Sequence, residues 1–146
     1  MIKINVVAVG RLKEKFWEDG VKEYTKWLEK YCECRVIEIP DGRSPEAEGA
    51  EIKKKLSGCV IACDVQGKLI SSEDLAEMID KKASAGKSEL TFLIGGSAGL
   101  SAEVKSLAEE KISFGRVTFP HLMMRVILCE QIYRAFTILH HTPYHK

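Results

Sequence analysis

The stretch LTFLIGGSAGL, residues 90–100, shows how the chain is built. Its first five residues are apolar or β-branched, which is typical of a strand buried on both faces. A glycine-rich turn follows, and Ser101 then supplies a side chain that can cap a new helix. A buried strand that leads through a short turn into a helix is the building unit of an α/β fold.

The same alternation extends in both directions from this unit. Apolar and β-branched runs predict strands at residues 2–9, 35–39, 59–65, 90–94 and 117–119. Helical spacing of apolar residues predicts helices at residues 12–31, 51–56 and 121–139, one capped by Ser101, and one beginning at the Ser71-x-x-Asp74 capping box. Residues 40–49, with two prolines and two glycines, are expected to form a mobile loop. We therefore predict a single α/β domain over residues 1–146 with a mainly parallel sheet.

The composition narrows the class of protein. Of the 146 residues, 45% are apolar, enough for a core that needs neither disulfides nor a structural metal. The 22 basic and 21 acidic side chains give a formal net charge of +1, which argues against holding nucleic acid by bulk electrostatics. No apolar run approaches the roughly 20 residues of a membrane helix, and the first residues lack the features of a signal peptide. The expected compartment is the cytoplasm, and neither a membrane nor DNA is an expected partner.

The five cysteines do not indicate a disulfide framework, because their number is odd and no export signal is present. Cys32 and Cys34 are two apart and Cys59 and Cys63 are four apart, which superficially resembles a four-thiolate zinc site. Neither pair is a C-x-x-C, and the second pair lies in or beside an apolar run, where free thiols behave as small hydrophobic groups. We expect no metal site.

Ligands of parallel α/β sheets generally bind beyond the carboxyl ends of the strands. This directs attention to residues 63–67, to the turn that begins at Gly95 and to residues 114–119. The glycine turn matches neither the dinucleotide fingerprint nor the P-loop. It is interpreted either as a tight turn that needs positive φ or as a place where a flat ligand approaches the backbone.

The last helix, residues 121–139, is apolar over most of its circumference. Such a helix needs more burial than one sheet face provides, so we expect a second surface, such as another subunit, to cover it. Glu130, Arg134, Thr137 and His141 share a narrow polar stripe, and the first two are spaced for a simple surface ion pair.

The tail HHTPYHK, residues 140–146, concentrates three of the four histidines. A frayed end is one interpretation, since terminal residues are often poorly ordered. The other is chemical: Tyr144 offers an aromatic face, and His145 is the side chain best suited to proton transfer near neutral pH.

Four segments in order resemble the RlmH family, the ribosomal large-subunit pseudouridine N3-methyltransferases of the SPOUT superfamily. They are VVAVGRLKEKFW, DVQGK with SSEDLA, LIGGSAGL, and TFPHLMMRVILCEQIYRAF with the ending PYHK. The resemblance covers the chain from end to end.

This resemblance implies a C-terminal part threaded into a trefoil knot, a homodimer, and S-adenosylmethionine bound in the knot. The cofactor pocket of the family falls on Cys63, Gly95, Phe114, Gly115, Arg116, Val117, Thr118 and Phe119. Cys63 departs from the family, which generally has leucine there; both side chains are apolar, so the contact is expected to survive with less packing area.

The resemblance also implies direct methyl transfer to N3 of a pseudouridine in 23S rRNA, presented on the assembled ribosome. The assigned roles are His145 as the base that takes the N3 proton, Arg134 as the group that stabilises negative charge on the base, and Tyr144 as a stacking or hydrogen-bonding partner. Alternatives are an enzyme of the same superfamily that acts on another RNA, such as tRNA, and a non-catalytic ribosome-binding protein.

Overall fold

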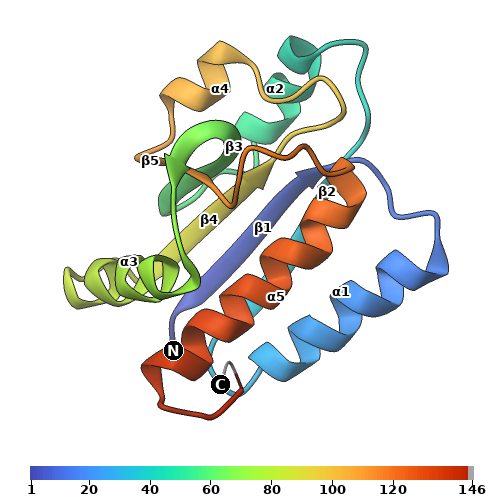
Figure 1. Cartoon of the computed structure of the whole chain (residues 1–146). Helices are drawn as coiled ribbons and strands as arrows, with labels where there is room; N and C mark the ends of the chain where they lie inside the picture. The colour runs from blue at the N-terminus through green and yellow to red at the C-terminus, as the bar shows by residue number, and fades with distance from the viewer. Residues whose placement is uncertain (145–146) are drawn as a thin grey trace.

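The computed structural model describes residues 1–144 and contains one five-stranded sheet flanked by helices (Figure 1). The strands are β1 (Lys3–Val9), β2 (Glu33–Ile39), β3 (Cys59–Leu69), β4 (Glu89–Ile94) and β5 (Glu110–Ser113). The helices are α1 (Lys15–Leu28), α2 (Pro45–Lys53), α3 (Ser72–Ser84), α4 (Ala102–Ser106) and α5 (His121–Leu139). The strand order is β2-β1-β4-β3-β5 and every pairing is parallel, which confirms the predicted α/β class.

Helices cover both faces of the sheet because alternate side chains of each strand point to opposite sides. On β1, Ile4, Val6 and Ala8 belong to one buried cluster, which also contains residues of α1, α3 and α5. Val7 and Val9 belong to a second, smaller cluster with residues of α2 and α4. Figure 1 shows the same division, with α5 lying along the sheet between α1 and α3.

The prediction that residues 40–49 form a mobile loop is wrong for the second half of this segment. Ser44 accepts a hydrogen bond from the backbone N–H of Ala47 (3.1 Å) and Pro45 occupies the first turn, so α2 begins there and ends at Lys53. The predicted helix at 51–56 is therefore displaced toward the N-terminus. Its capping serine lies among prolines, glycines and charges, a context that is typical of loops.

The last strand is also displaced from its predicted position. β5 spans Glu110–Ser113, whereas residues 117–119, predicted as a strand, form an exposed connection to α5. Ile112 pairs with both Cys63 and Lys68 of β3, because β3 has a register shift between those two residues. A short charged segment becomes a strand here through a long-range pairing that local composition does not reveal.

The first helix is shorter than predicted at both ends, because residues 12–14 precede α1 and residues 29–31 follow it. The capping box at Ser71 and the strand at 90–94 are confirmed, as is the last helix, which spans His121–Leu139.

In α5, Thr137 is fully buried and donates to the carbonyl of Arg134 (2.6 Å), so it does not belong to an exposed polar stripe. The trefoil knot stays a prediction.

Within residues 1–144, no helix combines the length and the apolar character that crossing a membrane requires. The same part of the chain contains no group of three or more histidine, cysteine or acidic side chains arranged to hold a metal ion.

The capping box of α3 gives a direct test of the local energetics. The Ser71 hydroxyl accepts from the N–H of Asp74 (3.0 Å), and the Asp74 carboxylate accepts from the N–H of Ser71 (2.8 Å). Replacing Ser71 with alanine should lower the free energy of unfolding by about 1 kcal/mol, measured by urea denaturation. Ser84→Ala, at the exposed other end of the same helix, should change it by less than about 0.5 kcal/mol. Equal losses in the two variants would contradict this assignment.

Candidate functional site

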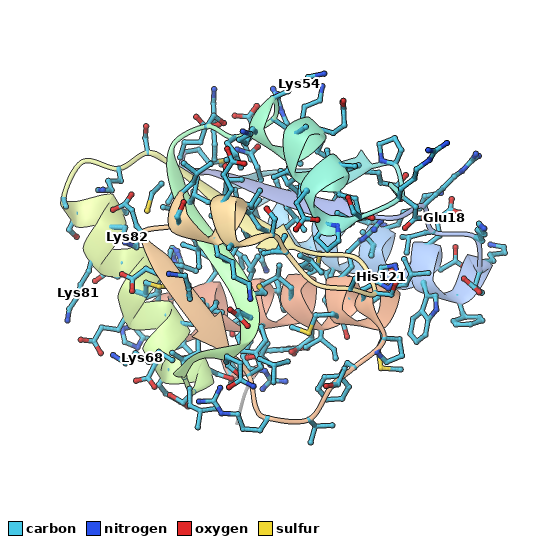
Figure 2. All side chains as sticks on the ribbon, turned by 90° about the horizontal axis from the view of Figure 1, so that it is seen from above. Glu18, Lys54, Lys68, Lys81, Lys82 and His121 are labelled. Atoms are coloured by element: carbon cyan, nitrogen blue, oxygen red, sulfur yellow. The ribbon has the colours of Figure 1, made fainter. Side chains whose placement is uncertain are left out.

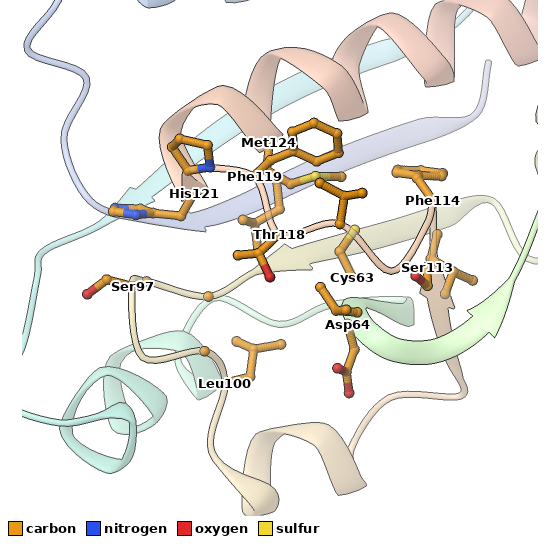
Figure 3. A pocket seen from close by; sticks show the side chains of 18 of the residues that line it. Cys63, Asp64, Ser97, Leu100, Ser113, Phe114, Thr118, Phe119, His121 and Met124 are labelled. Atoms are coloured by element: carbon orange, nitrogen blue, oxygen red, sulfur yellow. The ribbon is translucent and has the colours of Figure 1, made fainter.

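A cavity of about 610 Å³ opens beyond the carboxyl ends of β4 and β5 and beside the middle of β3 (Figure 3). Three segments line it: residues 63–65 at the bend of β3, residues 94–100 in the turn after β4, and residues 112–121 between β5 and α5. Met124, in the first turn of α5, and Lys105, in α4, complete the lining. The sequence-based prediction located all three segments.

Most of the predicted cofactor residues lie together around this cavity. Cys63, Gly95, Phe114, Gly115, Val117, Thr118 and Phe119 all line it. Burial raises the pKa of the Cys63 thiol to about 12, so the thiol is protonated at neutral pH and presents an apolar surface. Val117 is 67% exposed and Phe119 39% exposed, which leaves apolar groups at the rim open to solvent.

The glycine turn is a tight turn, as one interpretation of its sequence predicted, and it leaves part of its backbone uncovered. The N–H of Gly99 donates to the carbonyl of Gly96 (2.9 Å), and a side chain at Gly95 would place its Cβ 2.6 Å from the carbonyl carbon of Gly99. Gly95 is therefore required by the turn itself. Gly99 and Gly115, by contrast, have positive φ, and no atoms lie within 4 Å of the point that a Cβ would occupy, so their backbones are open to a ligand in the cavity.

An ion pair supplies charge to this otherwise largely apolar site. The Asp64 carboxylate lies 3.2 Å from the Lys105 ammonium, and both residues line the cavity. Burial alone would raise the pKa of Asp64, but the backbone N–H of Gln66 and the Lys105 ammonium hold it below its ordinary value. The pair thus offers an ionised acceptor and a cationic donor to a polar ligand. The sequence pointed to this ion pair only through Asp64, which directly follows Cys63 near the end of a predicted strand.

Arg116 differs from its neighbours because it does not line the cavity. Its Nη1 donates to the carbonyl oxygens of Val65 and Gly67, the latter at 3.0 Å. These carbonyls belong to the irregular part of β3, between the two pairings of Ile112. The side chain therefore ties the connection between β5 and α5 to the bend of β3 from outside the cavity.

A second group of predicted residues gathers at the other end of α5. Arg134 donates from Nε and Nη2 to Oε2 of Glu130 (3.1 and 2.7 Å), and the Tyr144 hydroxyl donates to the same oxygen (2.9 Å). The Arg134 guanidinium also lies over the Tyr144 ring, 4.9 Å from its centre. The pair of Glu130 and Arg134 is thus part of a three-residue cluster rather than an isolated surface ion pair. His145 lies outside the described residues.

The role of Glu130 was not evident from the sequence. Its spacing to Arg134 was visible, but Tyr144 reaches it only because the chain reverses after α5. His141 has a positive φ of 55°, and the N–H of Thr142 donates to the carbonyl of Thr137 (2.8 Å). These contacts fold the tail back along the helix.

The cavity and this cluster do not meet within one chain. Met124 and Arg134 are ten positions apart in α5, which corresponds to about 15 Å along the helix axis. In Figure 1 the last turns of α5 lie toward the N-terminus, at the amino-terminal end of β1, whereas the cavity lies at the opposite end of the sheet.

The cluster predicts an unusual tyrosine. Burial and the hydrogen bond to Glu130 raise the pKa of Tyr144 to about 12. The ultraviolet absorbance of the native protein and of Tyr144→Phe should therefore be titrated with pH and compared. The difference between them should show no ionisation of Tyr144 near pH 10, the ordinary pKa of tyrosine. Circular dichroism checks that both proteins stay folded. Glu130→Gln should bring the transition down toward that value. A wild-type transition near pH 10 would contradict the cluster.

Comparison with known proteins identifies the family. A family described as "Predicted SPOUT methyltransferase" matches residues 2–145. Proteins named ribosomal RNA large subunit methyltransferase H from Bacillus pumilus and Carboxydothermus hydrogenoformans are 45% and 47% identical over 159 residues, covering 99% of this chain and 100% of theirs.

Solved structures agree with the fold. TrmJ from Z. mobilis superposes with a TM-score of 0.57 at 14% identity, covering 94% of this chain and 71% of its own. A probable methylase family protein from Haemophilus influenzae gives 0.52 at 14% identity, covering 99% and 70%. The match over nearly every residue and the close full-length relatives show that the chain belongs to the SPOUT methyltransferase family.

Proposed function

We propose that this protein transfers a methyl group from S-adenosylmethionine to N3 of a pseudouridine in 23S rRNA on the assembled ribosome. The observation that carries the proposal is the cavity, because all but one of the residues assigned to the cofactor from sequence line it, in a chain whose full-length relatives are named as rRNA methyltransferases. The reaction needs two neighbouring subunits, because the cavity and the C-terminal cluster lie apart within one chain.

The residues around the cavity fit this cofactor. The volume of about 610 Å³ lies within the range of small-molecule sites. Apolar groups such as Cys63 and Phe114 suit an adenine ring, while Gly95 and residues 115–119 would hold the nucleoside through the backbone. The Asp64 and Lys105 pair suits its hydroxyl, amino or carboxylate groups. When bound, S-adenosylmethionine supplies an activated methyl group on a sulfonium centre.

Arg116 acts in this scheme as a positioning residue. Its hydrogen bonds to Val65 and Gly67 hold the 114–119 connection at the bend of β3, so the cavity keeps its shape before the cofactor arrives. We therefore place its contribution to cofactor binding in the backbone that it fixes.

The C-terminal cluster provides groups for the RNA base. With its raised pKa, Tyr144 stays protonated at neutral pH and its hydroxyl proton is donated to Glu130, so it stacks on the RNA base or accepts a hydrogen bond from it and does not serve as a base. The Glu130 carboxylate raises the pKa of Arg134, which keeps a permanent cation available to stabilise charge on the pyrimidine carbonyls. N3 must lose its proton to become a good nucleophile, and we assign that step to His145.

The separation of these two groups leads us to propose a homodimer. Met123, Ile127, Glu130 and Arg134 recur at helical spacing on α5, and none of them is fully buried in one subunit. If two copies of α5 pack antiparallel and cross at the level of Cys129, midway between Met124 and Arg134, each Arg134 lies beside the other subunit's Met124. A two-fold interface of this kind builds two identical sites, each with the cavity of one chain and the tail of the other.

The cofactor assignment is tested by calorimetric titration with S-adenosylmethionine. Native protein should bind it saturably, and Thr118→Trp, which fills the cavity from its exposed rim, should abolish binding. Ser84→Trp, on the exposed end of α3, should bind as the native protein does. Arg116→Ala should weaken binding about tenfold by loosening the connection, and Arg116→Lys should recover part of the loss. Unchanged binding in Thr118→Trp would refute the assignment.

The RNA assignment is tested by methyl incorporation into assembled ribosomes, free 23S rRNA and tRNA, assayed separately. We expect incorporation on ribosomes, with kcat reduced at least about 100-fold in His145→Ala and the affinity for S-adenosylmethionine unchanged. Preferential methylation of tRNA would favour the other enzymatic interpretation. Binding to ribosomes without methylation of any RNA would favour a non-catalytic protein.

A further inference from the structure

The connection between β1 and α1, residues 10–14, borders the cavity but is not part of it. Gly10 lies directly against His121 of the cavity rim: a side chain there would place its Cβ 3.0 Å from Nε2 of His121. Figure 2 shows His121 and Glu18, in the first turn of α1, on the same side of the molecule, away from Lys81 on α3. Whatever docks on this connection therefore lies next to the mouth of the cavity.

A fully buried arginine fixes the backbone of this connection. From α5, Arg125 donates through Nη2 to the carbonyls of Gly10 (2.8 Å) and Val9 (3.3 Å), and through Nη1 to Oε2 of Glu38 (2.7 Å). The same Glu38 oxygen accepts from the N–H of Leu12 (3.1 Å). Nε of Arg125 has no partner within residues 1–144, so this guanidinium is buried at a cost. The methyl-transfer scheme gives this arrangement no task.

The fixed connection presents cations to solvent, and an exposed aromatic ring follows in the first turn of α1. Arg11 and Lys13 are exposed and make no ion pair within the described chain. Of the acidic groups nearby, Glu18 pairs with Lys22 (2.8 Å) and Asp19 with Lys15 (3.1 Å), which leaves Glu14 as the one anion of the connection itself.

The exposed ring is that of Phe16, which is 63% accessible and lies edge-on to Trp17 with ring centres 4.6 Å apart. The tryptophan supports one edge of the phenyl ring and leaves much of its surface free. Exposed guanidinium and ammonium groups contact phosphates, and an exposed aromatic face stacks on an unpaired base.

We propose that residues 11–16 form a second RNA-docking surface, in which Arg11 and Lys13 bind rRNA phosphates and Phe16 stacks on an unpaired base beside the target nucleotide. The inference rests on the proposed function, since it assigns the RNA substrate of that reaction a contact outside the catalytic groups. A near-neutral chain cannot hold RNA by overall charge, so it needs a few cations at fixed positions. Arg125 provides that fixation.

A protein partner fits this surface less well than RNA. Two unpaired, exposed cations precede the phenyl ring within five residues, whereas the centres of protein interfaces are depleted in charge, and lysine in particular is under-represented. The experiment below nevertheless distinguishes RNA from a second copy of this chain as the occupant of the surface.

The experiment measures co-sedimentation with large ribosomal subunits as a function of salt. Arg11→Glu/Lys13→Glu and Phe16→Ala should each weaken binding roughly tenfold, and the double variant should also reduce the salt dependence by about one to two phosphate contacts. Arg11→Lys/Lys13→Arg should bind as the native protein does. Lys54→Glu/Lys81→Glu, which changes the charge equally at exposed sites distant from His121, should have little effect.

Parallel measurements separate the possible failures. Affinity for S-adenosylmethionine and the dimer mass from light scattering should be unchanged in all these variants. Native affinity in the double variant would overturn the proposal, and so would its dissociation into monomers, which would identify a subunit interface. Native protein that binds ribosomes through these residues but methylates no RNA would refute the proposed function while leaving the docking surface intact.

Discussion

The length of α5 is the constraint on which the rest of this structure depends. Its first turn closes the cavity through Met124, and its last turns carry Arg134 and receive Tyr144. A helix of 19 residues is about 28 Å long and too stiff to bring its ends together. The groups that suit a cofactor and those that suit a base are therefore kept apart within each chain, and the homodimer proposed above is the arrangement that would bring them together.

The sheet positions the cofactor end of this arrangement. Five parallel strands, of which β1 and β4 are buried almost throughout, point their carboxyl ends toward the same edge, and connections at this edge form the cavity. β3 shifts its register between Cys63 and Lys68, and Arg116 fixes the connection between β5 and α5 to this irregular part of the strand. Gly95 lets the turn after β4 close on itself, while Gly99 and Gly115 leave backbone accessible to a ligand. Shape here is set by the backbone before any ligand binds.

Sequence patterns that span only a few residues correctly predicted the elements that short-range interactions define. The strand at 90–94 and the Ser71 capping box were found because burial and capping leave patterns within a few residues. β5 was misplaced because residues 110–113 become a strand only by pairing with β3, some 50 residues earlier. The residues that line the cavity were predicted from the tendency of ligands to bind at the carboxyl ends of parallel strands and from the family resemblance. The sequence did not identify Glu130 as the acceptor shared by Arg134 and Tyr144, because its contact with Tyr144 exists only after the tail folds back. It also gave no sign that Arg125 is buried, because arginine side chains are rarely fully buried.

The central claim is that each active site combines the cavity of one subunit with the tail of its partner, and subunit complementation tests it most directly. Thr118→Trp and Arg134→Ala subunits, each inactive alone, are co-expressed with different tags, and the doubly tagged heterodimer is purified. The shared arrangement predicts one intact site per heterodimer and therefore roughly half the methyl-transfer rate of the native dimer on ribosomes. A heterodimer as inactive as its parents, with native mass and fold, would contradict the account.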